Sequence, residues 1–135
     1  MEQSRIIRKE DDLGRGRDEV WRVIPRAPGY EASTLGRIRL VGHDPIKPRL
    51  TRKGRQIVDV VADGRASRTI EVHCLVADAF HGPRPPEMTV DHLDDDPVNN
   101  RPDNLEYVTN LENQRRRWER VRRADQQLAK LARAA

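Results

Sequence analysis

An aspartate–histidine pair, Asp91-His92, is followed at short range by two asparagines, Asn104 and Asn113. Carboxylate and amide oxygens are ligands that hold a hard divalent cation, and an imidazole can accept a proton near neutral pH. A bound cation and a proton acceptor are together what the hydrolysis of a phosphodiester requires. These four residues are therefore candidates for a hydrolytic site that acts on a nucleic acid.

The acidic residues beside this pair divide into two groups. Asp94, Asp95 and Asp96 are consecutive and are typical of a turn, in which aspartate side chains bind nearby backbone amides. Asp91 precedes a histidine at the end of a predicted strand, and a carboxylate beside a phosphate is repulsive unless a cation lies between them. We assign Asp91 to a metal ion and the other three to the turn. Oxygen ligands favour Mg²⁺ or Mn²⁺ over Zn²⁺, and one ion over the two-metal arrangement, which needs bridging carboxylates.

The elements that must position these residues form a strand–loop–strand–helix pattern. The sequence predicts a strand over Met88 to His92, a polar loop over Leu93 to Asn104 and a second strand over Leu105 to Val108. Thr109 and Glu112 have the Thr-x-x-Glu spacing of a capping box, which predicts a helix that starts at Thr109. Asn113 would then lie in the first turn of this helix, close to the ends of both strands.

The chain before this unit predicts short strands and one helix. Period-two patterns, β-branched runs and the hairpin signal Asp63-Gly64 indicate strands near Val20 to Ile24, Tyr30 to Ser33, Arg37 to Leu40, Ile57 to Val61 and Thr69 to Val72. His73 to Phe80 then has helical spacing and is followed by the prolines Pro83, Pro85 and Pro86. A β-rich segment should therefore precede the candidate site.

The overall charge favours an anionic partner. The 135-residue chain has a net charge of +4 and a pI of about 9.7. The only lysines are Lys9, Lys47, Lys53 and Lys130, so most of the positive charge is arginine, which suits phosphates and base edges. A GC-rich genome would enrich arginine equally well without a binding role. The single cysteine, Cys74, excludes an intramolecular disulfide, and no apolar run suggests a signal peptide or a membrane span.

Arginines at two places are candidates for contacts with DNA. Arg37 and Arg39 share one face of a predicted strand, and the C-terminal helix carries Arg115, Arg116, Arg117 and Arg120. A solvated surface explains the two strand arginines equally well. The helix also has an apolar stripe, formed by Leu111, Trp118, Val121, Leu128 and Leu131. This stripe should pack on the domain or on a second subunit, so we expect a monomer or a homodimer formed through this helix.

Several linked motifs carry a family resemblance. From Val72 to about Arg117 the chain resembles the HNH endonucleases of the ββα-metal superfamily, especially those of phages and mobile introns. The motifs are His73-Cys74-Leu75-Val76-Ala77, Ala79-Phe80, Val90 to Asp96, Asn99-Asn100, Asn104 to Thr109 and Glu112-Asn113. Upstream, Trp21, Pro28 to Glu31, Ser33 and Leu35 to Ile38 resemble the module often found before this nuclease domain. The sequence departs from the family pattern at Cys74, which replaces a frequent arginine, and at Asp95, which replaces a glycine.

The resemblance implies a role for each candidate residue. Asp91 and Asn113 would bind one Mg²⁺ or Mn²⁺ ion, and His92 would be the general base. Asn104 would brace the loop and orient the site, while His73 is interpreted as structural. The implied activity is metal-dependent hydrolysis of DNA, by nicking or by double-strand cleavage. The alternative is a non-catalytic DNA-binding module with the same fold, against which the intact Asp91, His92 and Asn113 argue.

The expected fold is α+β, with a small β-rich module, a ββα-metal HNH core and an extended basic helix. We expect a mobile arm over residues 1–18, the β-rich module over 19–72, the nuclease core over 73–117 and the amphipathic helix over 118–135. The expected location is the cytoplasm of a bacterial or phage-infected cell. Aspartate tolerates a left-handed backbone better than most residues, so we expect the turn at Asp95 to be preserved.

Overall fold

The computed structural model describes residues 18–61 and 66–134. Nearly all of the predicted N-terminal arm and the Asp63-Gly64 hairpin signal lie outside these residues. The order of elements is β1 (Trp21–Ile24), β2 (Ala27–Ser33), β3 (Ile38–Leu40), β4 (Arg49–Leu50), β5 (Gln56–Val61), β6 (Ser67–Glu71), α2 (Val72–His81), β7 (Met88–His92), η1 (Pro102–Asn104), β8 (Leu105–Thr109) and α3 (Asn110–Ala134). This is the predicted α+β arrangement of small sheets, a ββα unit and a long C-terminal helix.

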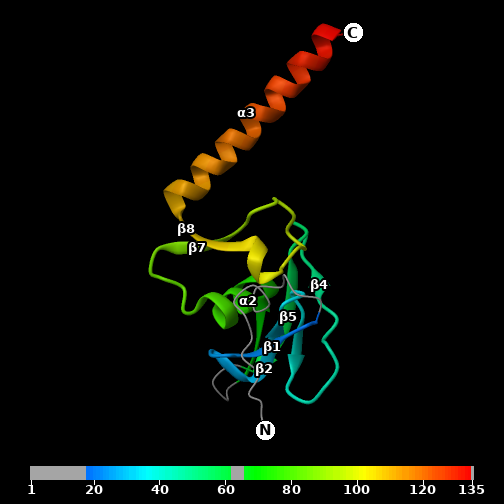
Figure 1. Cartoon of the computed structure of the whole chain (residues 1–135), viewed down its shortest axis with the longest axis vertical. Helices are drawn as coiled ribbons and strands as arrows, with labels where there is room; N and C mark the ends of the chain where they lie inside the picture. The colour runs from blue at the N-terminus through cyan, green and yellow to red at the C-terminus, as the bar shows by residue number, and fades with distance from the viewer. Residues whose placement is uncertain (1–17, 62–65, 135) are drawn as a thin grey trace.

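Helix α2 lies at the centre of the molecule and is packed against the small antiparallel sheets (Figure 1). One sheet has the strand order β1-β2-β3 and the next has the order β4-β5-β6. Leu75 and Val76 of α2 are fully buried, together with Ile24, Ile38 and Val60 from the two sheets. Burial of these aliphatic side chains in one cluster holds the N-terminal sheets to the segment that precedes the candidate site.

The start of α2 differs slightly from the prediction. Val72 was expected to end a strand, but it is the first residue of α2. The β5–β6 ladder ends where Ile57 pairs with Glu71, so the chain is free to turn into a helix at the next residue. The Val72 side chain is buried in the core, which explains why an apolar residue stands at this junction.

Strands β7 and β8 form the two-stranded sheet of the ββα unit. They are antiparallel, with Asp91 opposite Glu106 and His92 opposite Leu105. The strand predicted over Met88 to His92 is confirmed, and the second strand is one residue longer than predicted. Because side chains alternate along a strand, the neighbours Asp91 and His92 leave β7 in different directions.

Helix α3 begins as the capping motif predicts and then projects away from the rest of the molecule (Figure 1). The amide of Glu112 donates to Thr109 Oγ1 at 3.1 Å, which satisfies one free amide of the first turn. The predicted apolar stripe does not pack on the described part of the domain, since Trp118 is 67% exposed and Leu128 is 65% exposed. Packing of the stripe on a second subunit stays a prediction. No helix in the described ranges is long and apolar enough to cross a membrane.

Candidate active site

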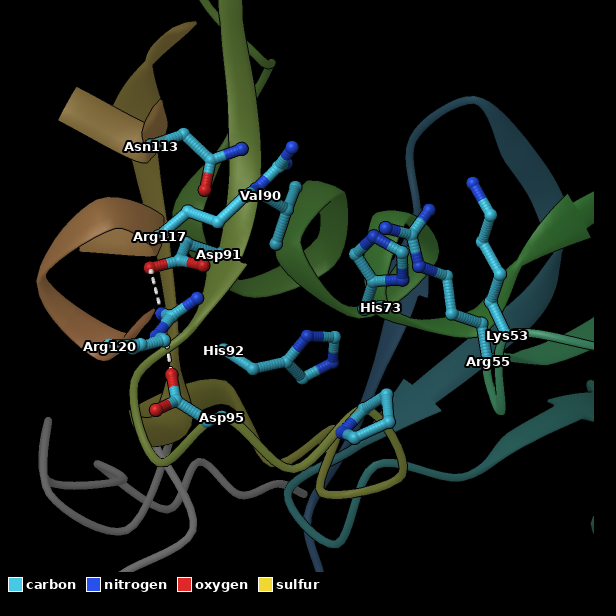
Figure 2. A pocket seen from close by; sticks show the side chains of 11 residues that line it. Lys53, Arg55, His73, Val90, Asp91, His92, Asp95, Asn113, Arg117 and Arg120 are labelled. Atoms are coloured by element: carbon cyan, nitrogen blue, oxygen red, sulfur yellow. Dashed lines mark ion pairs between the residues drawn. The ribbon is translucent and has the colours of Figure 1, made fainter. Parts of the chain in front are cut away.

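The residues predicted to do chemistry line one open pocket between the ββα unit and the N-terminal sheets. Asp91, His92 and Asn113 all contribute to it (Figure 2). The full lining is Lys53, Arg55, His73, Val90, Asp91, His92, Asp95, Pro97, Asn113, Arg117 and Arg120. Asn104 does not line the pocket and lies in the loop between β7 and β8. The fold thus brings a carboxylate, an amide and an imidazole to one surface that is bordered by cationic side chains.

Asp91 is a buried carboxylate held by arginines of α3. It is 8% exposed, and its Oδ2 atom accepts a hydrogen bond from Arg116 Nη1 at 2.8 Å. Arg120 Nη2 lies 3.6 Å from the same oxygen. These guanidiniums compensate the cost of burying a charge, and the bond to Asp91 raises the pKa of Arg116. Figure 2 shows the second carboxylate oxygen pointing toward the middle of the pocket.

Asn113 completes a pair of oxygen donors suited to a hard cation. It lies in the first turn of α3, where its side-chain amide points toward Asp91 (Figure 2). One carboxylate and one amide oxygen fit Mg²⁺ or Mn²⁺, which keep several positions for water and substrate oxygens. The donor set lacks the histidine or cysteine ligands that would favour Zn²⁺. The residues present therefore fit the predicted metal.

His92 is held by a hydrogen bond to a buried asparagine. Its Nε2 atom lies 2.8 Å from Asn100 Oδ1. An amide oxygen can only accept, so Nε2 carries the hydrogen and Nδ1 keeps the lone pair that accepts a proton. Asn100 Nδ2 in turn donates to Gln56 Oε1 at 2.9 Å. Asn100 belongs to one of the motifs that resemble the HNH family, but the sequence predicted no role for it. Its partner Gln56 is 44 residues away in the chain, so no local pattern connects the two.

The acidic run after His92 is a turn, as predicted. The Asp94 carboxylate accepts hydrogen bonds from the amide of Asp96 at 2.9 Å and from Asn99 Nδ2 at 2.8 Å. These bonds, with the Asn99 contact the largest, lower the pKa of Asp94. Asp95 has a φ of 65°, so the residue that replaces the family glycine adopts the left-handed conformation expected of it.

Asn104 braces this turn through hydrogen bonds of its side chain. Its Oδ1 atom accepts from the amide of Asp94 at 3.1 Å, while Nδ2 donates to Asp94 Oδ1 at 2.8 Å and to the carbonyl of Asn99 at 2.9 Å. The side chain is only 9% exposed, so these groups would be left without partners if it were removed. The geometry agrees with a loop-bracing role.

We expect Asn104→Ala to destabilise the protein by about 2–4 kcal/mol, since three hydrogen bonds are lost in a buried setting at about 1 kcal/mol each. Urea unfolding followed by circular dichroism measures this change. Asn110→Ala, at the exposed first residue of α3, is the matched control and should change the free energy of unfolding little. Equal stability of Asn104→Ala and the wild type would contradict the bracing role.

Comparison with known proteins agrees with this arrangement. Residues 71–115 match the HNH endonuclease family model. A 102-residue stretch is 31% identical to an uncharacterized HNH endonuclease of Acanthamoeba polyphaga mimivirus and covers 72% of this chain and 25% of that protein. Residues 71–115 are thus similar to the HNH endonucleases, and the chain spans about a quarter of the length of this viral relative.

A solved structure extends the HNH match to the fold. The HNH homing endonuclease I-HmuI, whose structure concerns DNA binding and cleavage, superposes with a TM-score of 0.66 and 27% sequence identity. The similarity covers 82% of this chain and 66% of that one. It thus extends well beyond the 45 residues of the HNH match. Members of the HNH family typically use a divalent metal ion, and its binding by Asp91 and Asn113 stays a prediction.

The predicted DNA-binding arginines occupy three different settings around the HNH site. Arg117 and Arg120 line the pocket, and Arg120 is also engaged by Asp91 and Asp95. Arg116 is engaged by Asp91, Glu106 and Glu112, and Arg115 by Glu112. Arg37 and Arg39 form ion pairs with Glu19 and Glu31 and lie over the Trp21 ring. Contact of these arginines with DNA stays a prediction. Lys53 and Arg55, which line the opposite wall, were not singled out from the sequence, although the basic turn Arg52-Lys53-Gly54-Arg55 signals them.

His73 lies beside the candidate base, with ring centroids 5.0 Å apart. It is buried, and its pKa is lowered to about 4, chiefly by burial and to a smaller extent by the nearby His92. His73 is therefore neutral at the pH at which His92 would act as a base. The structural interpretation made from the sequence agrees with this position.

This lowered pKa predicts a pH-dependent stability. Between pH 6.5 and pH 4 the unfolded chain binds a proton that folded His73 does not, so stability falls as pH drops through this window, by about 3 kcal/mol for this group. His73→Gln cannot titrate and should reduce that part of the acid sensitivity. Urea unfolding of both proteins in chelator at pH 7 and pH 4.5 tests the difference. Parallel losses of stability in the two proteins would contradict it.

A second group of possible metal ligands lies at the start of α2. Ligand atoms of Glu71, His73 and Cys74 lie within 4.8 Å of one another. His73 Nε2 is 3.6 Å from Cys74 Sγ and 3.8 Å from Glu71 Oε1. Burial raises the pKa of the Cys74 thiol. The three residues could hold a metal ion, and their nitrogen and sulfur donors differ from the oxygen donors of Asp91 and Asn113.

Proposed function

We propose that this protein is a metal-dependent HNH endonuclease that hydrolyses DNA phosphodiester bonds, of the type found in phages and mobile elements. The observation that carries the proposal is the shared pocket of Asp91, His92 and Asn113. The fold of a DNA-cleaving homing endonuclease and the cationic rim of the pocket support DNA as the substrate. The non-catalytic alternative would assign no role to the pocket-facing oxygen of Asp91 or to the oriented imidazole of His92.

The proposed reaction places each side chain in a specific role. His92 Nδ1 accepts a proton from water as the water oxygen forms a bond to phosphorus. The bond from phosphorus to the leaving ester oxygen breaks, and that oxygen keeps the electron pair and takes up a proton from solvent. General-base catalysis of this kind contributes about 10²–10⁴-fold to the rate. Asp91 and Asn113 would hold one Mg²⁺ or Mn²⁺ ion, which supplies Lewis-acid stabilisation of negative charge on the phosphate. Asn104 keeps the loop in place without touching the substrate.

Lys53, Arg55, Arg117 and Arg120 border the pocket and would hold the DNA backbone. The first two come from the N-terminal sheets and the last two from α3, on opposite sides of His92 (Figure 2). A strand that lies in the pocket would therefore be contacted from both sides by cations that neutralise its phosphates. This arrangement gives the N-terminal sheets a direct part in binding.

The double variant Lys53→Gln/Arg117→Gln should weaken DNA binding and reduce its salt dependence. Each lost phosphate contact lowers the slope of log K against log salt by about one, so we expect a change of about two. Fluorescence anisotropy with a labelled duplex at several salt concentrations measures the slope. Arg68→Gln, which changes an exposed arginine of β6, is the control. Identical slopes for the wild type and the double variant would contradict backbone contacts in the pocket.

Relaxation of supercoiled plasmid tests the proposed activity directly. The wild type should produce nicked or linear DNA with Mg²⁺ or Mn²⁺ and should be inactive in chelator. The ratio of nicked to linear product distinguishes single-strand from double-strand cleavage. DNA binding without metal-dependent cleavage, on several plasmids, would support the non-catalytic module instead.

A further inference from the structure

Asn100 lies where the HNH loop meets the N-terminal sheets. It is 2% exposed, and both ends of its side-chain amide are engaged. The oxygen faces His92 Nε2 at 2.8 Å and the nitrogen donates to Gln56 Oε1 at 2.9 Å. Gln56 is the first residue of β5, in a different sheet from His92. A continuous chain of two hydrogen bonds therefore joins the β4-β5-β6 sheet to the candidate base.

We propose that Gln56 and Asn100 are positioning residues through which the N-terminal sheet sets the tautomer and orientation of His92. This inference rests on the proposed function, because it assigns a task to the general base. A neutral imidazole carries its hydrogen on either nitrogen, and only the form with Nε2–H leaves Nδ1 free to accept a proton. An amide oxygen opposite Nε2 favours that form and also stabilises the imidazolium formed when the water proton is taken up.

The orientation of the Asn100 amide decides which tautomer is favoured. With its oxygen toward His92, its nitrogen meets the Gln56 oxygen and both contacts are satisfied. With Gln56 placed as it is, a flipped Asn100 amide would set the Asn100 and Gln56 oxygens against each other in a buried position, which costs about 1–3 kcal/mol. In this arrangement the Gln56 oxygen keeps the Asn100 oxygen toward the base.

The first sheet supports Asn100 from another side. Gly36, in the turn between β2 and β3, has a φ of +79°, and a Cβ atom there would lie 2.7 Å from the carbonyl carbon and oxygen of Asn100. Only glycine permits both this backbone conformation and this close approach. The backbone of Asn100 thus packs against the turn between β2 and β3, and its side chain bonds to β5. The sheets would serve catalysis as well as DNA binding.

Nitrogen-15 NMR of the full chain in metal-free buffer tests the relay, because it reports which His92 nitrogen carries the hydrogen. The wild type should show the Nε2–H tautomer. Gln56→Leu removes the acceptor and should give a mixture of tautomers and a kcat about ten-fold lower, with KM nearly unchanged. Gln56→Glu keeps an acceptor oxygen toward Asn100 and should preserve both the tautomer and kcat.

Two results would overturn the relay. One is an Nδ1–H tautomer in the wild type, and the other is an unchanged tautomer and kcat in Gln56→Leu. Thermal unfolding of each variant separates a loss of fold from a loss of orientation. The NMR readout does not depend on cleavage. An inactive protein with the Nε2–H tautomer and a Gln56-dependent shift would therefore contradict the proposed function but support the relay.

A separate observation points to a second metal site of different chemistry. We infer that Glu71, His73 and Cys74 bind a Zn²⁺-like ion. The spacing of the His73 nitrogen from the Cys74 sulfur, 3.6 Å, and from the Glu71 oxygen, 3.8 Å, is close to that of ligands around one tetrahedral ion. A thiolate and a carboxylate together neutralise a divalent charge, and buried His73 offers a neutral nitrogen. Arg55 contacts Glu71 through Oε2 at 3.3 Å and leaves Oε1 toward His73.

Three protein ligands leave one position of a tetrahedral ion to solvent. The cluster borders a pocket that shares His73 and Asn113 with the HNH pocket, so an ion bound there would place positive charge beside His92. Cys74 stands where the family pattern noted in the sequence often has arginine, so its thiol is a departure from that pattern. Sulfur and nitrogen donors select Zn²⁺ or Co²⁺ over Mg²⁺.

Titration of the full chain with Co²⁺, followed by absorption spectroscopy, tests the second site. Binding should give a near-ultraviolet thiolate-to-cobalt band and visible bands of a tetrahedral ion, and Zn²⁺ should displace both. Cys74→Ser should lose the thiolate band, whereas Asp91→Asn should retain it. Absence of the band in the wild type, or its persistence in Cys74→Ser, would overturn the site. Neither readout depends on nuclease activity.

Discussion

Replacement of His92 by alanine should reduce Mg²⁺-dependent DNA cleavage by about 10²–10⁴-fold, the usual contribution of a positioned general base. The imidazole lines the metal pocket, and its bond to Asn100 leaves Nδ1 to accept the proton. The neighbouring imidazole of His73 is not placed to replace this function, because it is buried and directs Nε2 toward Glu71 and Cys74. Initial rates on a fluorescent duplex and on supercoiled plasmid give the size of the loss.

The His92→Ala experiment needs a control histidine and a binding measurement. His43 lies in an exposed loop after β3, and His43→Ala should cleave at the wild-type rate. Fluorescence anisotropy should show nearly equal DNA affinity for His92→Ala and the wild type, since the substitution removes neither a lysine nor an arginine that contacts the DNA phosphates. A variant that cleaves within about three-fold of the wild type would rule out His92 as the general base, because the expected effect is at least ten times larger.

The chemistry of the site was predictable from the sequence because its positioning elements are local. Asp91 and His92 end a strand, and Thr109 with Glu112 marks the helix start that places Asn113 beside them. A hairpin and a capped helix bring these positions together within one short segment. The turn residues were predictable for the same reason, since Asp94 and Asp96 bind amides two residues away.

The contacts between segments were not predictable in this way. Gln56 reaches Asn100 across 44 residues, and no local pattern encodes the packing of one sheet against the HNH loop. Lys53 and Arg55 line the pocket because of the same packing between sheet and loop, so their place in the site was not predictable either. Nor does hydrophobic periodicity reveal whether a helix has anything to pack against. The stripe of α3 follows a good amphipathic pattern, yet Trp118 and Leu128 remain exposed in the described chain.

Replacement of Asp91 by asparagine should raise the Mg²⁺ concentration needed for half-maximal cleavage by more than ten-fold. It should also lower the maximal rate by about 10²–10³-fold, because loss of several kcal/mol of metal stabilisation corresponds to that factor. Arg116 and Arg120 contact only Oδ2 in the structure, so the pocket-facing oxygen is the one left for a cation. Asn113→Ala should act in the same direction but more weakly, since an amide donor carries no net charge. Calorimetric titration with Mg²⁺ measures binding independently of cleavage, and Asp44→Asn, in an exposed loop, serves as the control. If Asp91→Asn bound Mg²⁺ as tightly as the wild type does, the cation would be held elsewhere and the Arg116–Asp91 ion pair would be purely structural.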